Sequence, residues 1–260
     1  MKKQVLVAGG AVLLACALYF GFTNKPPKVS AFDEKRAELI DSLDVPSETT
    51  IVALQAALKK DPENLQLLDS LSHLWFHAGF PAIAADYDRQ IADLNPSVEH
   101  YLRAGKSFFD AFPSDTSQNM QVNLVYGSRY CYEKALDIDS TNLDARIGLA
   151  SVFVQGTNDP MKGILMLREL DVEVPGNPLI NMELGRFSVM SGQYDKAIER
   201  FIVVLQKDSL NLQAHFLLAE SYMAVGDTLQ SVEVLRRTQG LTGDPVLDNQ
   251  VRQYIESLTN

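Results

Sequence analysis

Apolar side chains recur at spacings of three and four residues, the pattern of helices that bury one face. Near the N-terminus this pattern predicts one helix from Phe32 to Leu43 and a second from Glu48 to Lys60. Near the C-terminus it predicts a helix over residues 246–258, whose apolar face contains Leu247, Val251, Tyr254, Ile255 and Leu258. The sequence therefore predicts an all-α fold.

Between these helices, three series of positions recur with nearly the same step. The first series steps by 44, 35, 34 and 34 positions and consists of Ala84, Ser128, Gly163, Ala197 and Ser231. The second contains Ala57, Ile91, Ala135, Leu170, Val204 and Thr238. The third contains Pro62, Pro96, Ser140, Pro175 and Ser209. A period of this length is typical of a solenoid built from repeated helical pairs.

The segment from Met190 to Phe201 shows what one period contains. Gly192 suits a tight turn between two helices, because glycine accepts positive φ without a Cβ clash. Ala197 lets the helices approach closely, and Tyr194 and Phe201 fill the space between them. The charged residues of the segment fall on the other side of the helix. We therefore interpret this segment as a joint between two helices.

This pattern resembles the tetratricopeptide repeat (TPR) family, whose 34-residue unit is a pair of antiparallel helices. In the unit 178–211, the family's positions are filled by Leu184, Gly185, Gly192, Tyr194, Ala197 and Phe201, while Ser188 and Ser209 replace the usual aromatic residue and proline. The resemblance covers about residues 50–243. It implies a right-handed superhelical solenoid over residues 29–260, with units at 65–98, 99–142, 143–177, 178–211 and 212–245 and a capping helix at 246–258.

Two units depart from the regular period. The step of 44 places ten extra residues in the unit 99–142, near the turn and cap residues between Phe112 and Met120. We expect either a longer loop or extra helical turns there. The unit 143–177 carries one extra residue near Thr157 to Pro160, and its Gly163 stands where the family usually has alanine.

The resemblance implies that inner positions of each first helix form a concave groove. In the last three units these positions carry Asp144, Ile147, Ser151, Val154, Gln155, Leu179, Met182, Arg186, Val189, Met190, Gln213, Phe216, Glu220, Met223 and Ala224. We expect an apolar peptide or helix of another protein to bind at Ile147, Val154, Met182, Arg186, Val189, Met190, Phe216, Glu220 and Met223. The alternative is a structural, self-assembling envelope protein whose groove is filled by its own C-terminal helix or by a second subunit.

The first apolar run predicts membrane attachment. Eighteen uncharged residues, from Val5 to Phe22, lie between two pairs of lysines and would span most of a hydrocarbon core of about 30 Å. We expect residues 1–28 to be an uncleaved single-pass anchor and linker, because large aromatic residues crowd the end of the run. A cleaved signal peptide and lipidation at Cys16 are the alternatives. A narrow excess of bases before the run favours a periplasmic, extracytoplasmic repeat domain.

Charge limits the kinds of partner. Residues 1–28 hold four of the 23 basic residues and none of the 33 acidic ones, so the remainder carries a formal charge of −14. Nucleic acid is therefore not an expected partner, since a phosphate backbone requires clustered Lys and Arg. Another protein, the lipid bilayer and a second copy of the chain are the partners that the sequence allows.

Candidate chemistry is sparse, and we expect no enzyme activity, cofactor or metal. His73 and His77 have a spacing that can hold a metal, but no carboxylate accompanies them in the expected ligand pattern. Cys131 lies between two tyrosines on an expected second helix, and we interpret it as a packed thiol. The sequence contains no Gly-rich phosphate loop and no nucleophile motif.

Overall fold

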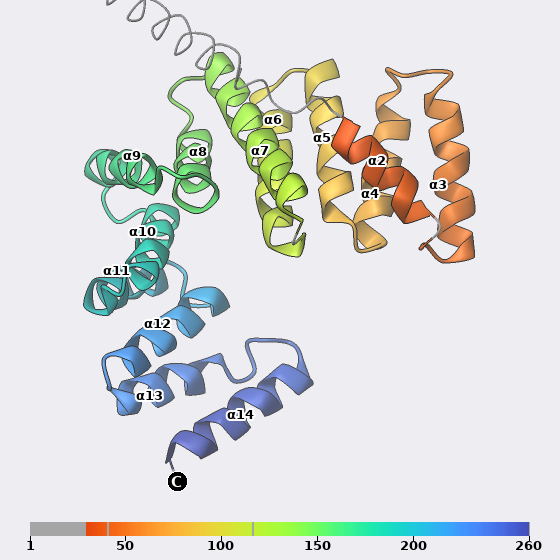
Figure 1. Cartoon of the computed structure of the whole chain (residues 1–260). Coiled ribbons are helices and arrows are strands. Elements are labelled where there is room, and N and C mark those ends of the chain that lie inside the picture. The colour runs from red at the N-terminus through yellow and green to blue at the C-terminus, as the bar shows by residue number, and fades with distance from the viewer. Residues whose placement is uncertain (1–29, 41, 116, 260) are drawn as a thin grey trace, which may run out of the picture.

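The computed structural model describes residues 30–40, 42–115 and 117–259, and over these residues it is helical throughout, without strands (Figure 1). The elements are α2 (Ser30–Ile40), α3 (Val45–Leu58), α4 (Leu65–His77), α5 (Pro81–Leu94), α6 (Val98–Ala111), the 3-10 helix η1 (Phe112–Ser114), α7 (Gln118–Ile138), α8 (Leu143–Gly156), α9 (Pro160–Glu173), α10 (Pro178–Met190), α11 (Tyr194–Lys207), α12 (Leu212–Ala224), α13 (Thr228–Thr238) and α14 (Pro245–Thr259). The predicted all-α fold is confirmed.

The predicted anchor, Val5 to Phe22, lies outside the described residues. Of the helices that are described, none combines the length and the apolar character that crossing a bilayer requires.

Five helical pairs, α4/α5, α6/α7, α8/α9, α10/α11 and α12/α13, stack one after another along the chain. Figure 1 shows the stack following a curved path, with α8, α10 and α12 on its inner side and α9, α11 and α13 on its outer side. The buried apolar side chains form three clusters that follow the chain from α2 to α14. Each pair thus packs mainly on its neighbours, as in a solenoid.

Each inner helix begins at a polar cap. The side-chain oxygens of Asn64, Asn142, Asn177 and Asn211 accept hydrogen bonds from backbone N–H groups in the first turns of α4, α8, α10 and α12. Ser97 does the same for α6. Such a cap stabilises a helix by about 1 kcal/mol, so this recurring residue fixes where each unit starts.

The predicted turn at Gly192 is confirmed. Its φ is 71°, and the backbone N–H of Gln193 donates to the Ser188 carbonyl at 2.7 Å, which closes the end of α10. Gly79 and Gly226 take positive φ at the corresponding ends of α4 and α12. A residue with a Cβ would be strained at these turns.

The ten extra residues of the unit 99–142 form helix rather than a long loop. Three of them form η1. Helix α7 has 21 residues, compared with 14 in α5, α9 and α11, which adds about two turns at its start. The second of the two expectations, extra helical turns, is therefore confirmed.

The two N-terminal helices are present, and each begins and ends two or three residues earlier than predicted. Helix α2 ends at Ile40 instead of Leu43, because the chain turns there with backbone hydrogen bonds from Ser42 to Leu39 and from Leu43 to Ile40. Helix α3 ends at Leu58, two residues before the predicted end.

Helix α2 packs across α5 and α7 rather than pairing with α3. Arg36 forms an ion pair with Asp86, whose side chain is fully buried on α5. The Phe32 ring lies 5.8 Å from that of Phe108. This position was not evident from the sequence, because its contacts join residues fifty or more positions apart.

At the other end, α14 packs on α13. The predicted apolar stripe is confirmed for Val251 and Ile255, which are buried, and for Leu247 and Leu258, which pack against the same cluster. Tyr254 is 49% exposed and does not join the core.

Helices α8 and α9 approach so closely that the glycine at position 163 is required. A Cβ on Gly163 would lie 2.3 Å from the backbone oxygen of Ala150 and 2.7 Å from Val154 Cγ2. A backbone oxygen cannot move aside as a flexible side chain can, so the departure from the family's alanine has a steric cause.

We expect Gly163→Ala to lower the free energy of unfolding by about 1–3 kcal/mol, the usual effect of overpacking. Ser231→Ala is the matched control, because it places alanine at the same position of the repeat. It removes a buried hydroxyl that has no hydrogen-bond partner among the described residues, so stability should be unchanged or higher. Thermal unfolding followed by circular dichroism measures both; equal losses would contradict the steric explanation.

Candidate protein-binding groove

The inner faces of α6, α8 and α10 converge on a hollow of about 690 Å³, here called the central hollow. Its lining includes Ile147, Met182 and Arg186, three of the predicted groove residues. Ile147 and Met182 are buried and form its floor, whereas Leu179 is 54% exposed at its rim. The residues at the first three inner positions of the units 143–177 and 178–211 thus all line the central hollow.

Helix α6 contributes a wall of the central hollow that is not among the predicted groove residues. Leu102, Lys106, Phe109 and Asp110 line it. Counted from Val98, they occupy the same helical positions as the residues predicted on α8 and α10. The sequence could have predicted these four residues, because the Ser97 cap marks Val98 as the first position of α6.

Tyr132 reaches the central hollow from the outer helix α7. Its ring lies between two glycines of the inner helices: a Cβ on Gly148 would be 2.3 Å from Tyr132 Cζ, and one on Gly105 would be 3.1 Å away. The side chain is buried, and it lines the hollow together with Gly148. Burial, together with the charges of Asp110 and Glu183, raises the pKa of Tyr132, so its hydroxyl stays protonated.

The cations that line the central hollow all have carboxylate partners. Lys106 pairs with Asp110. Arg186 lies 3.8 Å from Glu183, and Arg103 lies 3.8 Å from both Asp69 and Asp88. Two lining carboxylates, those of Asp144 and Asp208, have no cationic partner among the described residues. The excess charge in the hollow is therefore negative.

Glu183 is the most buried of the carboxylates that line the central hollow, with 15% of its side chain exposed. It accepts a hydrogen bond from Gln155 Nε2 at 3.1 Å. Burial raises the pKa of Glu183, and this effect outweighs the nearby Arg186 guanidinium, which lowers it.

The other predicted groove residues lie elsewhere. Phe216, Glu220 and Met223 line a second hollow of about 330 Å³, which Val251 and Tyr254 of α14 also line. Val154 is buried between α8 and α9, Val189 packs against the C-terminal core, and Met190 is exposed; none of these three lines either hollow. Of the nine predicted residues, three thus line the central hollow, three line the second hollow and three line neither.

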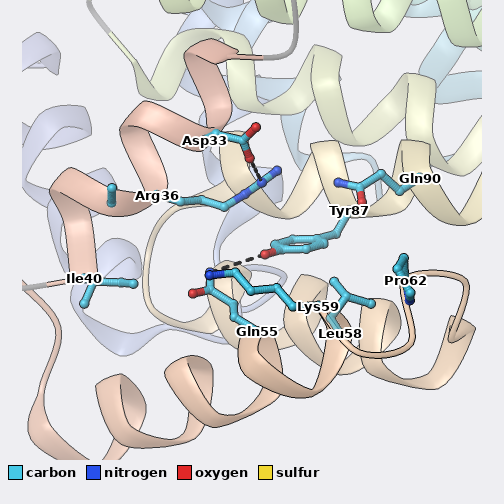
Figure 2. A pocket seen from close by; sticks show the side chains of 10 residues that line it. Asp33, Arg36, Ile40, Gln55, Leu58, Lys59, Pro62, Tyr87 and Gln90 are labelled. Atoms are coloured by element: carbon cyan, nitrogen blue, oxygen red, sulfur yellow. Dashed lines mark hydrogen bonds and ion pairs between the residues drawn. The ribbon is translucent and has the colours of Figure 1, made fainter.

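A third hollow, of about 650 Å³, lies between α2, α3 and α5 (Figure 2). The Arg36 guanidinium lies 4.5 Å from the centre of the Tyr87 ring, and the Tyr87 hydroxyl accepts from Gln55 Nε2 at 3.4 Å. Arg36 is also paired with Asp33 and Asp86. The Arg36 guanidinium thus joins α2 to α5 through Asp86 and Tyr87.

His73, His77 and Cys131 are the residues that the sequence offered as metal ligands or as a nucleophile. His73 and His77 stack with ring centres 6.5 Å apart on α4. The expectation that no carboxylate accompanies them is wrong, because Asp69 Oδ2 lies 3.8 Å from His73 Nε2. Within the described part of the chain, no cluster of three His, Cys, Asp or Glu side chains has metal-binding geometry. Cys131 is fully buried, which confirms a packed thiol, and burial raises its pKa.

The chain matches no family model and no curated protein. Its structure resembles that of a tetratricopeptide repeat protein from Parabacteroides merdae, with a TM-score of 0.59 and 14% sequence identity over 100% of this chain and 94% of that one. It also resembles a thermophilic TPR protein of Thermus thermophilus, with a TM-score of 0.51 and 13% identity over 68% of this chain and 91% of the other.

The chain has the TPR fold. In this TPR solenoid, α4, α6, α8, α10 and α12 are the first helices of the pairs, and the central hollow lies on the inner side that they form.

We expect Glu183→Gln to raise stability at neutral pH. Because its pKa is raised in the folded chain, ionised Glu183 is less favourable there than in the unfolded chain. That penalty is present above the raised pKa and is lost as the pH falls through it. The gain in Tm should therefore shrink on acidification and vanish below the ordinary pKa of 4.5.

Glu173→Gln is the control of opposite sign, since a hydrogen bond from Arg146 lowers the pKa of Glu173. That bond stabilises the ionised form, so this variant should lose stability at neutral pH and converge with the parent in acid. Thermal unfolding across a pH series measures both variants. A pH-independent gain for Glu183→Gln would contradict the assignment.

Proposed function

We propose that the protein is a non-catalytic scaffold for protein–protein interaction, which binds a peptide or helix of a partner in the central hollow. The observation that carries the proposal is the convergence of three inner helix faces on one open space with an apolar floor. A preformed concave surface loses little conformational entropy when a partner binds. Apolar side chains between paired charges suit an amphipathic segment.

The competing proposal is a structural, self-assembling role in which the groove is covered by this chain or a second copy. One observation favours it at the C-terminal end: α14 lies beside the hollow of Phe216 and Met223. The residues that line the central hollow come from α6 to α12, with none from α14. We therefore place the partner site at the central hollow.

We also propose that residues 1–28 tether the solenoid to a membrane, with the repeats on the periplasmic side. The support is the eighteen-residue uncharged run between lysine pairs. A tether would raise the local concentration of the groove near membrane-bound partners.

Photo-crosslinking at the rim of the central hollow tests the binding role. A benzophenone amino acid at Leu179 should capture a heterologous protein in the source cells, identified by mass spectrometry. The same probe at Val172, which is 81% exposed on the outer helix α9, should not capture it. Leu179 is preferable to buried Met182 as a labelling position, because its exposure leaves the fold intact.

Two outcomes would count against this role. Capture of only a second copy of the chain from position 179 would favour the structural alternative. Equal capture of the same protein from positions 172 and 179 would show that this protein does not bind preferentially to the inner side of the solenoid.

Fractionation tests the tether separately. The full chain should sediment with membranes and resist extraction by high salt, whereas a chain lacking residues 1–28 should appear in the supernatant with unchanged helical content. Retention of the truncated chain in the membrane fraction would place the attachment within the solenoid instead.

A further inference from the structure

We propose that the central hollow accepts a basic side chain, a lysine or an arginine, from the protein segment that binds in the groove, and that Tyr132 and Asp144 receive its charged end. This inference rests on the proposed function of the groove and specifies the chemistry of its partner.

The first observation is the position of the Tyr132 hydroxyl. The ring is fixed between Gly105 and Gly148, and Cζ, which carries the hydroxyl, would be the ring atom nearest to a Cβ at Gly148 and one of the two nearest to a Cβ at Gly105. Among the described residues, this hydroxyl makes no hydrogen bond, although the other tyrosine hydroxyls near by, those of Tyr101 and Tyr130, donate to Asp93. A buried side chain thus presents an unpartnered polar group to the hollow.

The second observation is the charge balance. Since Arg103, Lys106 and Arg186 are each matched by carboxylates, the unmatched charges in the lining are those of Asp144 and Asp208. Asp144 begins the same helix that carries Gly148. A tyrosine oxygen can accept a hydrogen bond from an ammonium or guanidinium group. The hollow therefore favours a cation and disfavours a carboxylate.

The third observation is the apolar surface around these polar groups. Ile147 and Met182 are buried at the floor, and Phe109 lies on the α6 wall. Lysine and arginine carry long aliphatic stems that pack on apolar surface while the charged end reaches a polar group. A shorter side chain would cover less of this floor, and an uncharged polar one would leave the Asp144 carboxylate without a cationic partner among the described residues.

A random peptide library displayed on phage and selected against the full chain supplies the probe. Selected peptides should share a lysine or arginine beside an apolar residue. Replacing that basic residue with methionine, which keeps the length and removes the charge, should weaken binding about tenfold, the usual effect of losing a charged hydrogen bond.

A double-mutant cycle then tests the assigned residues. Tyr132→Phe keeps the ring between the two glycines and should weaken the basic peptide about tenfold while leaving the methionine peptide unchanged. Asp144→Asn should weaken the basic peptide about two- to fivefold. Tyr130→Phe is the matched control on the same helix, because Tyr130 does not line the hollow, and it should change neither affinity.

The outcomes separate this inference from the function on which it rests. Selected peptides without a basic residue, or an equal effect of Tyr132→Phe on both peptides, would overturn the inference while groove binding stands. Failure to select any peptide, or peptides that bind Leu179→Glu as tightly as the parent, would overturn the proposed function as well.

Discussion

Close approach between helices at glycine is the constraint on which this structure depends. Phe201 of α11 packs against Gly185 of α10, where a Cβ would lie 2.6 Å from the ring, and Phe108 of α6 packs in the same way against Gly127 of α7. In each case a ring on one helix takes the space of a missing side chain on its partner. Because interiors are packed as densely as crystals, these contacts set the distance between the two helices of a pair.

The sequence predicted the parts of the fold that repeat. Small residues, turn glycines and apolar stripes report contacts within a pair, and such contacts have a fixed spacing along the chain. Helix α2 has no such signal. Its position depends on the buried ion pair between Arg36 and Asp86, and a pair of residues separated by fifty positions leaves no local pattern to read. The asparagines that cap four of the inner helices also follow the repeat, so they could have been used to predict where these helices begin.

The candidate site was only partly predictable for a related reason. The family's inner positions specify which side of a helix faces the groove, and this sufficed for Ile147, Met182 and Arg186. The inner positions do not specify which residues of other helices lie opposite that face. Phe216 faces α14, and Tyr132 enters from an outer helix through a gap that exists only because Gly105 and Gly148 lack side chains. Contacts of this kind arise from packing between units, after the units have formed.

The same packing explains how an open groove is compatible with a stable solenoid. Each inner helix buries one side against its outer partner and its neighbours, so stability comes from the core clusters and does not require the groove to be filled. At the C-terminal end, α14 supplies the cover that a terminal repeat needs. The central hollow is bounded by the stacked pairs themselves, and its lining combines buried apolar side chains with the Tyr132 hydroxyl, which has no hydrogen-bond partner in the described part of the chain. An apolar floor alone would favour any apolar segment, whereas this unpartnered hydroxyl and the unmatched carboxylates add a polar requirement that only some segments can meet.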